Sequence, residues 1–193
     1  ETTVNDNLTV TGDLSVTGAH PGWVKIAQNT PSSAATTAFE SGIDSTYDVY
    51  MIVATNIHSE VDDDDLYGLV GTGGTPTYAD STGDYQRIQF YATTGGLTAG
   101  GNDNTDKLTF GIVDLGNAAD EALNVVIYMY SPADATSYTT FYSTPAGQNE
   151  SGDLRMGFNW GQYDASTAVT ALKLFFSKGD IASGTFTLYG LQK

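Results

Sequence analysis

The chain has 193 residues, no cysteine, and 23 acidic side chains against 7 basic ones, for a formal net charge of −16. The absence of cysteine excludes disulfide bonds and cysteine-ligated metal sites. The excess of carboxylates disfavours nucleic acids and anionic membrane surfaces as partners, because both repel a negative protein. No apolar run reaches the roughly 20 residues that a membrane-spanning helix needs, so we expect no membrane insertion.

Two similar hexads, residues 7–12 and 13–18, share the order polar, Leu, hydroxyl, Val, Thr, Gly. Their aliphatic residues have one parity, so they lie on one side of two short strands that cannot enclose a core. The partner of this apolar face is either the rest of the chain, with the hexads as an edge hairpin, or the same stretch in sister chains around a symmetry axis. We favour a short β stalk at residues 1–20, with a trimer interface that contains Leu8, Val10, Leu14 and Val16.

Residues 21–193 predict an all-β knob domain. Runs that alternate, or that are rich in β-branched and aromatic residues, are separated by Gly- and Asp-rich stretches, and no ten-residue segment has a helical period. About ten strands in this length indicate a jelly-roll-like antiparallel β-sandwich. We expect loops at 62–65, 71–83, 95–106 and 144–152. The expected strands are 23–27, 47–57, 66–70, 85–93, 107–115, 123–130, 138–143, 154–163, 168–176 and 185–191.

Residues that could carry catalysis are sparse. His20 and His58 are the only histidines, and no Gly-x-Ser-x-Gly elbow supports a nucleophilic serine. Paired carboxylates could hydrolyse a glycan, but a chain with this many aspartates brings such pairs together by chance. We therefore predict a protein that is not an enzyme and that needs no cofactor.

Hard oxygen ligands suited to Ca²⁺ occur in an unbroken run of four aspartates. Successive carboxylates cannot all point at one ion without a sharp turn, so a solvated loop is the favoured interpretation. A second segment, 102–106, begins like a calcium-binding loop, but Lys107 stands where that loop needs glycine. We predict no metal site, and the candidate ligands to check are Asp62, Asp63, Asp64 and Asp65.

Tyrosine is the commonest aromatic residue, with 12 Tyr against 8 Phe and 2 Trp. Three tyrosines, Tyr78, Tyr85 and Tyr163, lie in or beside expected loops. Amphipathic rings at such positions suit contacts with carbohydrate or protein. The alternative is that they pack on the edge of the sandwich. We take these three as the candidate receptor-binding residues.

Residues 168–191, which end in FSKGDIASGTFTLYGL, resemble the closing segment of fibre or host-attachment proteins from the virions of tailed bacteriophages. The segment STYDVY at 45–50 is similar to another part of these proteins, and the Leu-x-Val-Thr-Gly hexads are similar to stalk repeats of phage fibres. Residues 61–152 have no close match. The resemblance implies a homotrimer with a β-sandwich tip, located in the virion, with its N-terminal end toward other virion proteins. It implies no catalytic residues.

The closing segment is apolar on both faces. Leu172 and Leu174 face one way and Phe175 the other, and we expect residues 185–191 to return beside this strand as a hairpin. A strand that is apolar on both faces is buried on both sides. One side would face the sandwich core, and the other could face a sister subunit.

The first functional hypothesis is a trimeric, non-enzymatic virion fibre protein whose knob binds a glycan or protein on the host surface. The alternative is a structural or decorating virion protein, such as a head fibre or tail-tip component, without a receptor of its own. A glycan-cleaving enzyme of the tailspike type is the third. Both leading hypotheses need the same stalk and the same trimer, so the sequence barely separates them.

Overall fold

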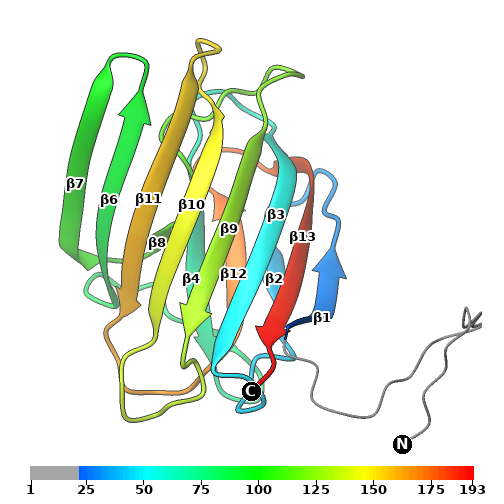
Figure 1. Cartoon of the computed structure of the whole chain (residues 1–193), viewed down its shortest axis with the longest axis vertical. Helices are drawn as coiled ribbons and strands as arrows, with labels where there is room; N and C mark the ends of the chain where they lie inside the picture. The colour runs from blue at the N-terminus through cyan, green and yellow to red at the C-terminus, as the bar shows by residue number, and fades with distance from the viewer. Residues whose placement is uncertain (1–21) are drawn as a thin grey trace, which may run out of the picture.

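Two antiparallel β-sheets lie face to face with an apolar interior between them (Figure 1). The structure is a computed structural model that describes residues 22–193. Within this range no residue is helical, and no helix long and apolar enough to cross a membrane is found. The strands are β1 (Trp23–Asn29), β2 (Thr37–Phe39), β3 (Val49–Ser59), β4 (Leu66–Thr72), β5 (Thr77–Tyr78), β6 (Tyr85–Thr93), β7 (Gly96–Thr105), β8 (Leu108–Thr109), β9 (Leu123–Tyr130), β10 (Thr140–Gln148), β11 (Leu154–Tyr163), β12 (Val169–Phe176) and β13 (Ile181–Leu191).

The two sheets differ in size. The large sheet has eight strands in the order β1-β13-β3-β9-β10-β11-β6-β7. The small sheet has five, in the order β2-β12-β4-β5 with β8 also paired to β4, and three of them are only two or three residues long. All the strand pairs are antiparallel, so the predicted all-β antiparallel sandwich is confirmed.

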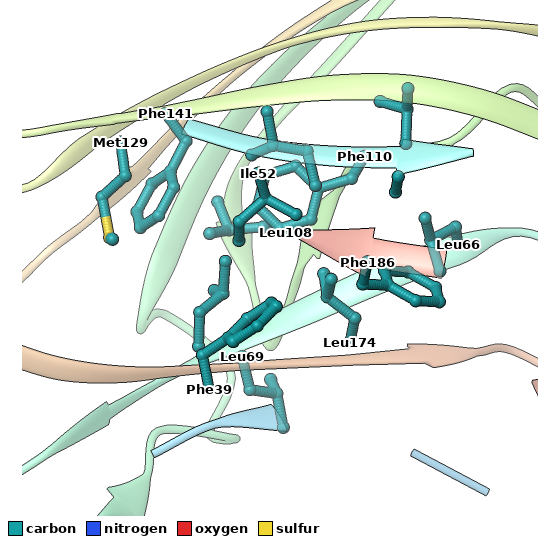
Figure 2. Close-up of a cluster of buried hydrophobic side chains, with 14 of the residues drawn as sticks. Phe39, Ile52, Leu66, Leu69, Leu108, Phe110, Met129, Phe141, Leu174 and Phe186 are labelled. Carbon is teal, nitrogen blue, oxygen red and sulfur yellow. The ribbon is translucent and has the colours of Figure 1, made fainter. Parts of the chain in front are cut away.

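Period-2 alternation sets which side chains enter the interior. In β9 every second residue from 123 to 129 is buried, and the residues between them are half-buried or exposed. Figure 2 shows Ile52 and Phe141 of the large sheet opposite Leu69 and Leu174 of the small sheet. Each large apolar side chain buried in this way contributes about 1.5–3 kcal/mol to folding.

The segment from Leu108 to Leu115 covers the part of the large sheet that the small sheet does not reach. We predicted one strand at 107–115, but only Leu108–Thr109 pair as β8, so this prediction is largely wrong. Phe110 is buried, and its carbonyl oxygen accepts a hydrogen bond from Ser143 Oγ of β10 at 3.1 Å. The Asn159 amide of β11 donates to the Gly111 carbonyl oxygen at 3.0 Å. Side chains of the large sheet thus bind these two carbonyl oxygens, while the N–H groups of Phe110 and Gly111 both donate to the Leu66 carbonyl oxygen of β4.

The closing segment does not form the expected hairpin. Strand β12 pairs with β2 and β4 in the small sheet, whereas β13 pairs with β1 and β3 in the large sheet. The chain crosses from one sheet to the other between Phe176 and Ile181. The hairpin prediction was wrong because apolar strands that follow each other in the chain can pack face to face in different sheets. They do not have to be hydrogen-bonded neighbours in one sheet.

Three expected loops contain strand. Residues 95–106 contain all of β7, residues 144–148 complete β10, and residues 71–83 contain the end of β4 and all of β5. Strand β7 is the edge of the large sheet, and nine of its ten residues are exposed. An exposed edge strand needs no apolar face, so its Gly and Asn residues carried no strand signal.

A close approach across the small sheet requires glycine at position 68. A Cβ built there would lie 2.4 Å from Cε2 of the buried Phe110 ring. We expect Gly68→Ala to destabilise the protein by about 1–3 kcal/mol, because a packed ring cannot move aside freely. Gly100→Ala in β7 is the control, since nothing lies within 4 Å of its Cβ position. Equal urea midpoints for the two variants would contradict this packing.

Candidate binding surface on the large sheet

The outer face of the large sheet presents large apolar side chains to solvent. Strand β11 has Gly157, Asn159 and Gly161 on its inner side, while its outward side chains are much larger. Met156, Phe158 and Trp160 share one parity in the sequence, and the structure places that parity outside. The outward residues Leu154, Met156, Phe158 and Trp160 are 61%, 47%, 45% and 50% exposed.

An aromatic row crosses the sheet through cross-strand neighbours. Trp160 is the cross-strand partner of Tyr142, and Tyr142 is the partner of Tyr128. The Tyr142 ring centroid lies 4.5 Å from that of Trp160 and 6.3 Å from that of Tyr128. Trp23 of β1 extends the row, with its ring centroid 6.1 Å from that of Tyr128. Four strands, β1, β9, β10 and β11, thus contribute rings to one aromatic row.

The strands behind this face are nearly free of carboxylates although the chain has 23 of them. Seven of the eight strands of the large sheet contain no Asp or Glu at all, and only the edge strand β7 contains one, Asp103. Lys25 is the basic residue on the outer side, beside Tyr189. Another molecule that approaches this face therefore meets little charge.

The face is as large as a specific protein interface. Eight strands at spacings of about 4.8 Å, each about nine residues long at about 3.4 Å per residue, give an area of roughly 1,000 Å². Standard interfaces bury about 800 Å² on each partner. This face, which we call the open face, is therefore large enough to be a candidate binding surface.

A pocket of about 620 Å³ opens at one end of the open face, over β10, β11, β6 and β7. Trp160 and Ile88 supply its apolar lining, and Gln86, Gln162 and Thr140 are polar residues around it. Its volume falls within the range of roughly 300–1,000 Å³ that is typical of small-molecule sites.

Two of the three candidate tyrosines belong to the core. Tyr85 is fully buried, its hydroxyl accepts from the Val70 N–H and donates to the Ala79 carbonyl oxygen, both at 2.9 Å, and burial raises the pKa of the phenol. Tyr163 is 9% exposed, with its ring centroid 5.7 Å from that of Tyr85. The prediction that Tyr85 and Tyr163 contact a receptor is wrong, because their strand parity points them inward.

Tyr78 lies at the edge of the small sheet, away from the open face. Its half-buried ring has the Lys173 Nζ 4.1 Å from its centroid, and its hydroxyl donates to a Glu40 carboxylate oxygen at 2.9 Å. A receptor contact by Tyr78 stays a prediction. The proposed trimer residues Leu8, Val10, Leu14 and Val16 lie outside the described residues.

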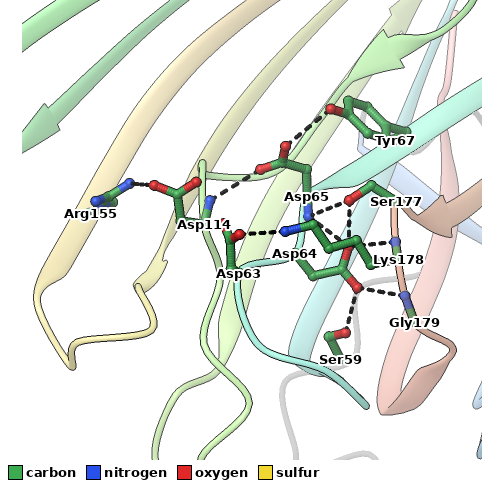
Figure 3. Close-up of polar contacts among 10 residues, drawn as sticks. All are labelled: Ser59, Asp63, Asp64, Asp65, Tyr67, Asp114, Arg155, Ser177, Lys178 and Gly179. Carbon is green, nitrogen blue, oxygen red and sulfur yellow. Dashed lines mark hydrogen bonds and ion pairs between the residues drawn. The ribbon is translucent and has the colours of Figure 1, made fainter.

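The aspartate run 62–65 is not simply a solvated loop. Asp64 is completely buried between β3 and β4 (Figure 3). Its Oδ2 accepts hydrogen bonds from Ser59 Oγ at 2.7 Å and the Gly179 N–H at 3.0 Å. Its Oδ1 accepts from Ser177 Oγ at 2.6 Å and from the backbone N–H groups of Asp65 and Lys178, each at 2.9 Å. Asp64 therefore joins the β3–β4 connection to the crossing between β12 and β13.

The other three aspartates point to different partners. Asp62 accepts from the Asn117 N–H, and Asp63 pairs with Lys178, which lowers the pKa of the Asp63 carboxyl. Asp65 accepts from the Tyr67 hydroxyl, and burial raises the pKa of its carboxyl. Among residues 22–193 no group of three or more His, Cys, Asp or Glu side chains is placed to hold a metal ion.

The role of Asp64 can be tested with an isosteric change. We expect Asp64→Asn to destabilise the protein by about 3 kcal/mol. The asparagine NH₂ would face O–H or N–H groups that now donate to a carboxylate oxygen, and those groups would lose their acceptor. Asp62→Asn is the matched control, since Asp62 is exposed and accepts one recorded hydrogen bond. Urea unfolding of both variants measures the difference. Equal losses in the free energy of unfolding would show that the hydrogen bonds of Asp64 stabilise the protein no more than that of Asp62.

No protein-family model matches the chain, and no curated protein matches it. Among solved structures, the comparison finds the crystal structure of an infectious bursal disease virus VP2 subviral particle, at 12% sequence identity and a TM-score of 0.19. The match covers 89% of this chain and 41% of that one, so the chain spans less than half of that protein's length. A TM-score this low carries no argument about fold or function.

Proposed function

We propose that the protein is a non-enzymatic fibre protein of a tailed-bacteriophage virion, with a trimeric, jelly-roll-like knob that attaches the particle to the host surface. The observation that carries the proposal is the open face, an aromatic surface without carboxylates outside β7 on a chain of net charge −16. Attachment through three copies multiplies contacts that are weak one at a time. The phage-like closing segment supports the same assignment.

The segments that carry the resemblance lie together in the structure. Strand β3, which begins within STYDVY, pairs with β13, which contains most of the closing motif. A Cβ on Gly190 would lie 2.3 Å from the Tyr47 ring, so this glycine lets the two segments approach closely. These positions form the scaffold of the knob. The resemblance therefore supports the kind of domain proposed, and other residues would determine which receptor it binds.

Within this proposal, the occupant of the apolar end of the open face is a second copy of the chain. Leu154, Met156 and Phe158 form this end together with Phe90 and Leu97 of the neighbouring strands. Two chains of charge −16 repel each other wherever carboxylates meet, so they approach most easily through strands that have none.

The assembly is tested by sedimentation equilibrium. We expect the wild-type chain to sediment at about three times its mass of 20.4 kDa. Phe158→Asp should dissociate it, because the change places a carboxylate in the proposed contact. Tyr138→Asp is the matched control, since Tyr138 is 47% exposed but lies outside the strands. A wild-type protein at one chain mass, or equal effects of both changes, would contradict the proposal.

The stalk is tested separately by changing Leu8, Val10, Leu14 and Val16 together to Ser. We expect the trimer to dissociate at lower urea concentration, because the apolar side chains that would meet between sister stalks are lost. The thermal unfolding of the knob is the control and should change little. Full trimer stability in this variant would leave the repeat without the proposed role.

Attachment is tested by incubating labelled full-length protein with a panel of bacterial strains and measuring the bound fraction. We expect saturable binding to some strains, with stronger retention of the trimer than of the Phe158→Asp variant because of valency. Incubation with the bound strain's polysaccharide should release no new reducing ends. Absence of binding together with location on the capsid would support the decorating protein instead, and new reducing ends would support the tailspike-type enzyme.

A further inference from the structure

We propose that the pocket at the Trp160 end of the open face is a subsite for a neutral saccharide. The inference deepens the proposed attachment function and rests on it for its biological role. The pocket combines an exposed aromatic ring with amide and hydroxyl groups, and one carboxylate holds the two amides in place. Side chains of this chain supply all of these groups.

The aromatic platform is Trp160. Its side chain is 50% exposed, and the Tyr142 ring supports it from the neighbouring strand at a centroid distance of 4.5 Å. Ile88, which is the cross-strand partner of Trp160 on the other side, is 54% exposed and extends the apolar lining. The C–H face of a pyranose ring is apolar and its edge is polar, so it can stack on an indole while its hydroxyls remain hydrogen-bonded.

The polar groups are oriented before any ligand arrives. Asp164 accepts a hydrogen bond from the Gln86 amide at 2.8 Å through one carboxylate oxygen, and from the Gln162 amide at 2.7 Å through the other. Each amide therefore keeps its carbonyl oxygen and its second N–H for another partner. Thr140 lines the same pocket and adds a hydroxyl. Preorganised donors and acceptors reduce the entropy that a sugar hydroxyl would otherwise lose on binding.

The charges around the pocket favour a neutral ligand. Asp103 and Arg87 both line it, and Asp164 accepts from its two amides, so an anionic sugar would meet two carboxylates. The guanidinium of Arg87 does not offset them, because it donates to Thr109 and lies 5.9 Å from the centroid of the Tyr67 ring, on the inner side of the sheet. The chemistry of the pocket thus selects an uncharged oligosaccharide over a sialylated, sulfated or phosphorylated one.

The pocket and the proposed trimer contact occupy different ends of β11. Leu154 and Met156 begin the strand, whereas Trp160 and Gln162 end it beside the start of β6 and β10. Copies that cover the first end leave the second one accessible. One chain can therefore use its open face both for assembly and for a ligand.

The test measures binding of neutral trisaccharides to the full-length protein by titration calorimetry and by ¹H–¹⁵N spectra. The probes are cellotriose, maltotriose, chitotriose and galactotriose, with sialyllactose as the anionic comparison. We expect at least one neutral probe to bind at millimolar concentration and to shift the side-chain amide signals of Gln86 and Gln162. Trp160→Ala should weaken binding at least about tenfold, whereas Tyr138→Ala, which removes an exposed aromatic ring outside the strands and outside the pocket lining, should leave it unchanged.

Asp164 is a positioning residue in this proposal, and Asp164→Asn tests that role. We expect several-fold weaker saccharide binding with little change in thermal stability, together with altered Gln86 and Gln162 amide signals in the free protein. A purely structural role would lower stability and leave the affinity of the folded protein unchanged. That result would overturn the positioning role. Binding of no neutral probe, tighter binding of sialyllactose, or binding insensitive to Trp160→Ala would overturn the subsite.

The strain-binding assay separates this inference from the attachment function. Strain binding that survives Trp160→Ala at full strength, with no saccharide bound by the wild type, would overturn the subsite and leave attachment standing. Saccharide binding that depends on Trp160, with no strain bound by the protein, would support the subsite and remove attachment.

Discussion

The architecture depends on an imbalance between two sheets. Each sheet of a sandwich is stabilised by burying one apolar face, but the large sheet has large apolar side chains on both faces. The small sheet and the segment from Leu108 to Leu115 cover its inner face. Its outer face has no cover within residues 22–193. The free energy gained by removing that surface from water is therefore available for binding, either to sister chains or to a ligand.

A buried carboxylate holds the two sheets in this arrangement. Strands β3 and β4 belong to different sheets, as do β12 and β13, so the chain crosses the sandwich twice at the same end. Asp64 lies in the first crossing and accepts hydrogen bonds from Ser177, Lys178 and Gly179 in the second. A buried charge is costly unless fully hydrogen-bonded, and five protein donors satisfy this one. This part of the closing segment thus binds a side chain that is over 110 residues away in the sequence.

Strand positions could be predicted from the sequence where apolar and polar side chains alternate, and the prediction failed where they do not. The ranges 85–93, 123–130 and 154–163 were predicted with the bounds that the structure has. The glycine-rich β7 was missed because pairing with β6 holds it in extended form, and its own residues add little. The core tyrosine Tyr85 was mistaken for a surface residue because a position beside a loop does not reveal which way a strand turns its first side chain.

The sequence by itself determined the all-β class, most of the strands, and the concentration of charge outside the strands, because alternation and composition are local properties. It also revealed that Met156, Phe158 and Trp160 share a side. Only the tertiary structure decided that this side faces solvent, since the choice depends on which face of β11 meets the Leu108–Leu115 segment. Gly161 leaves room for Leu108 and the Asn159 amide donates to the Gly111 carbonyl oxygen, so these residues turn inward and the aromatic ones outward.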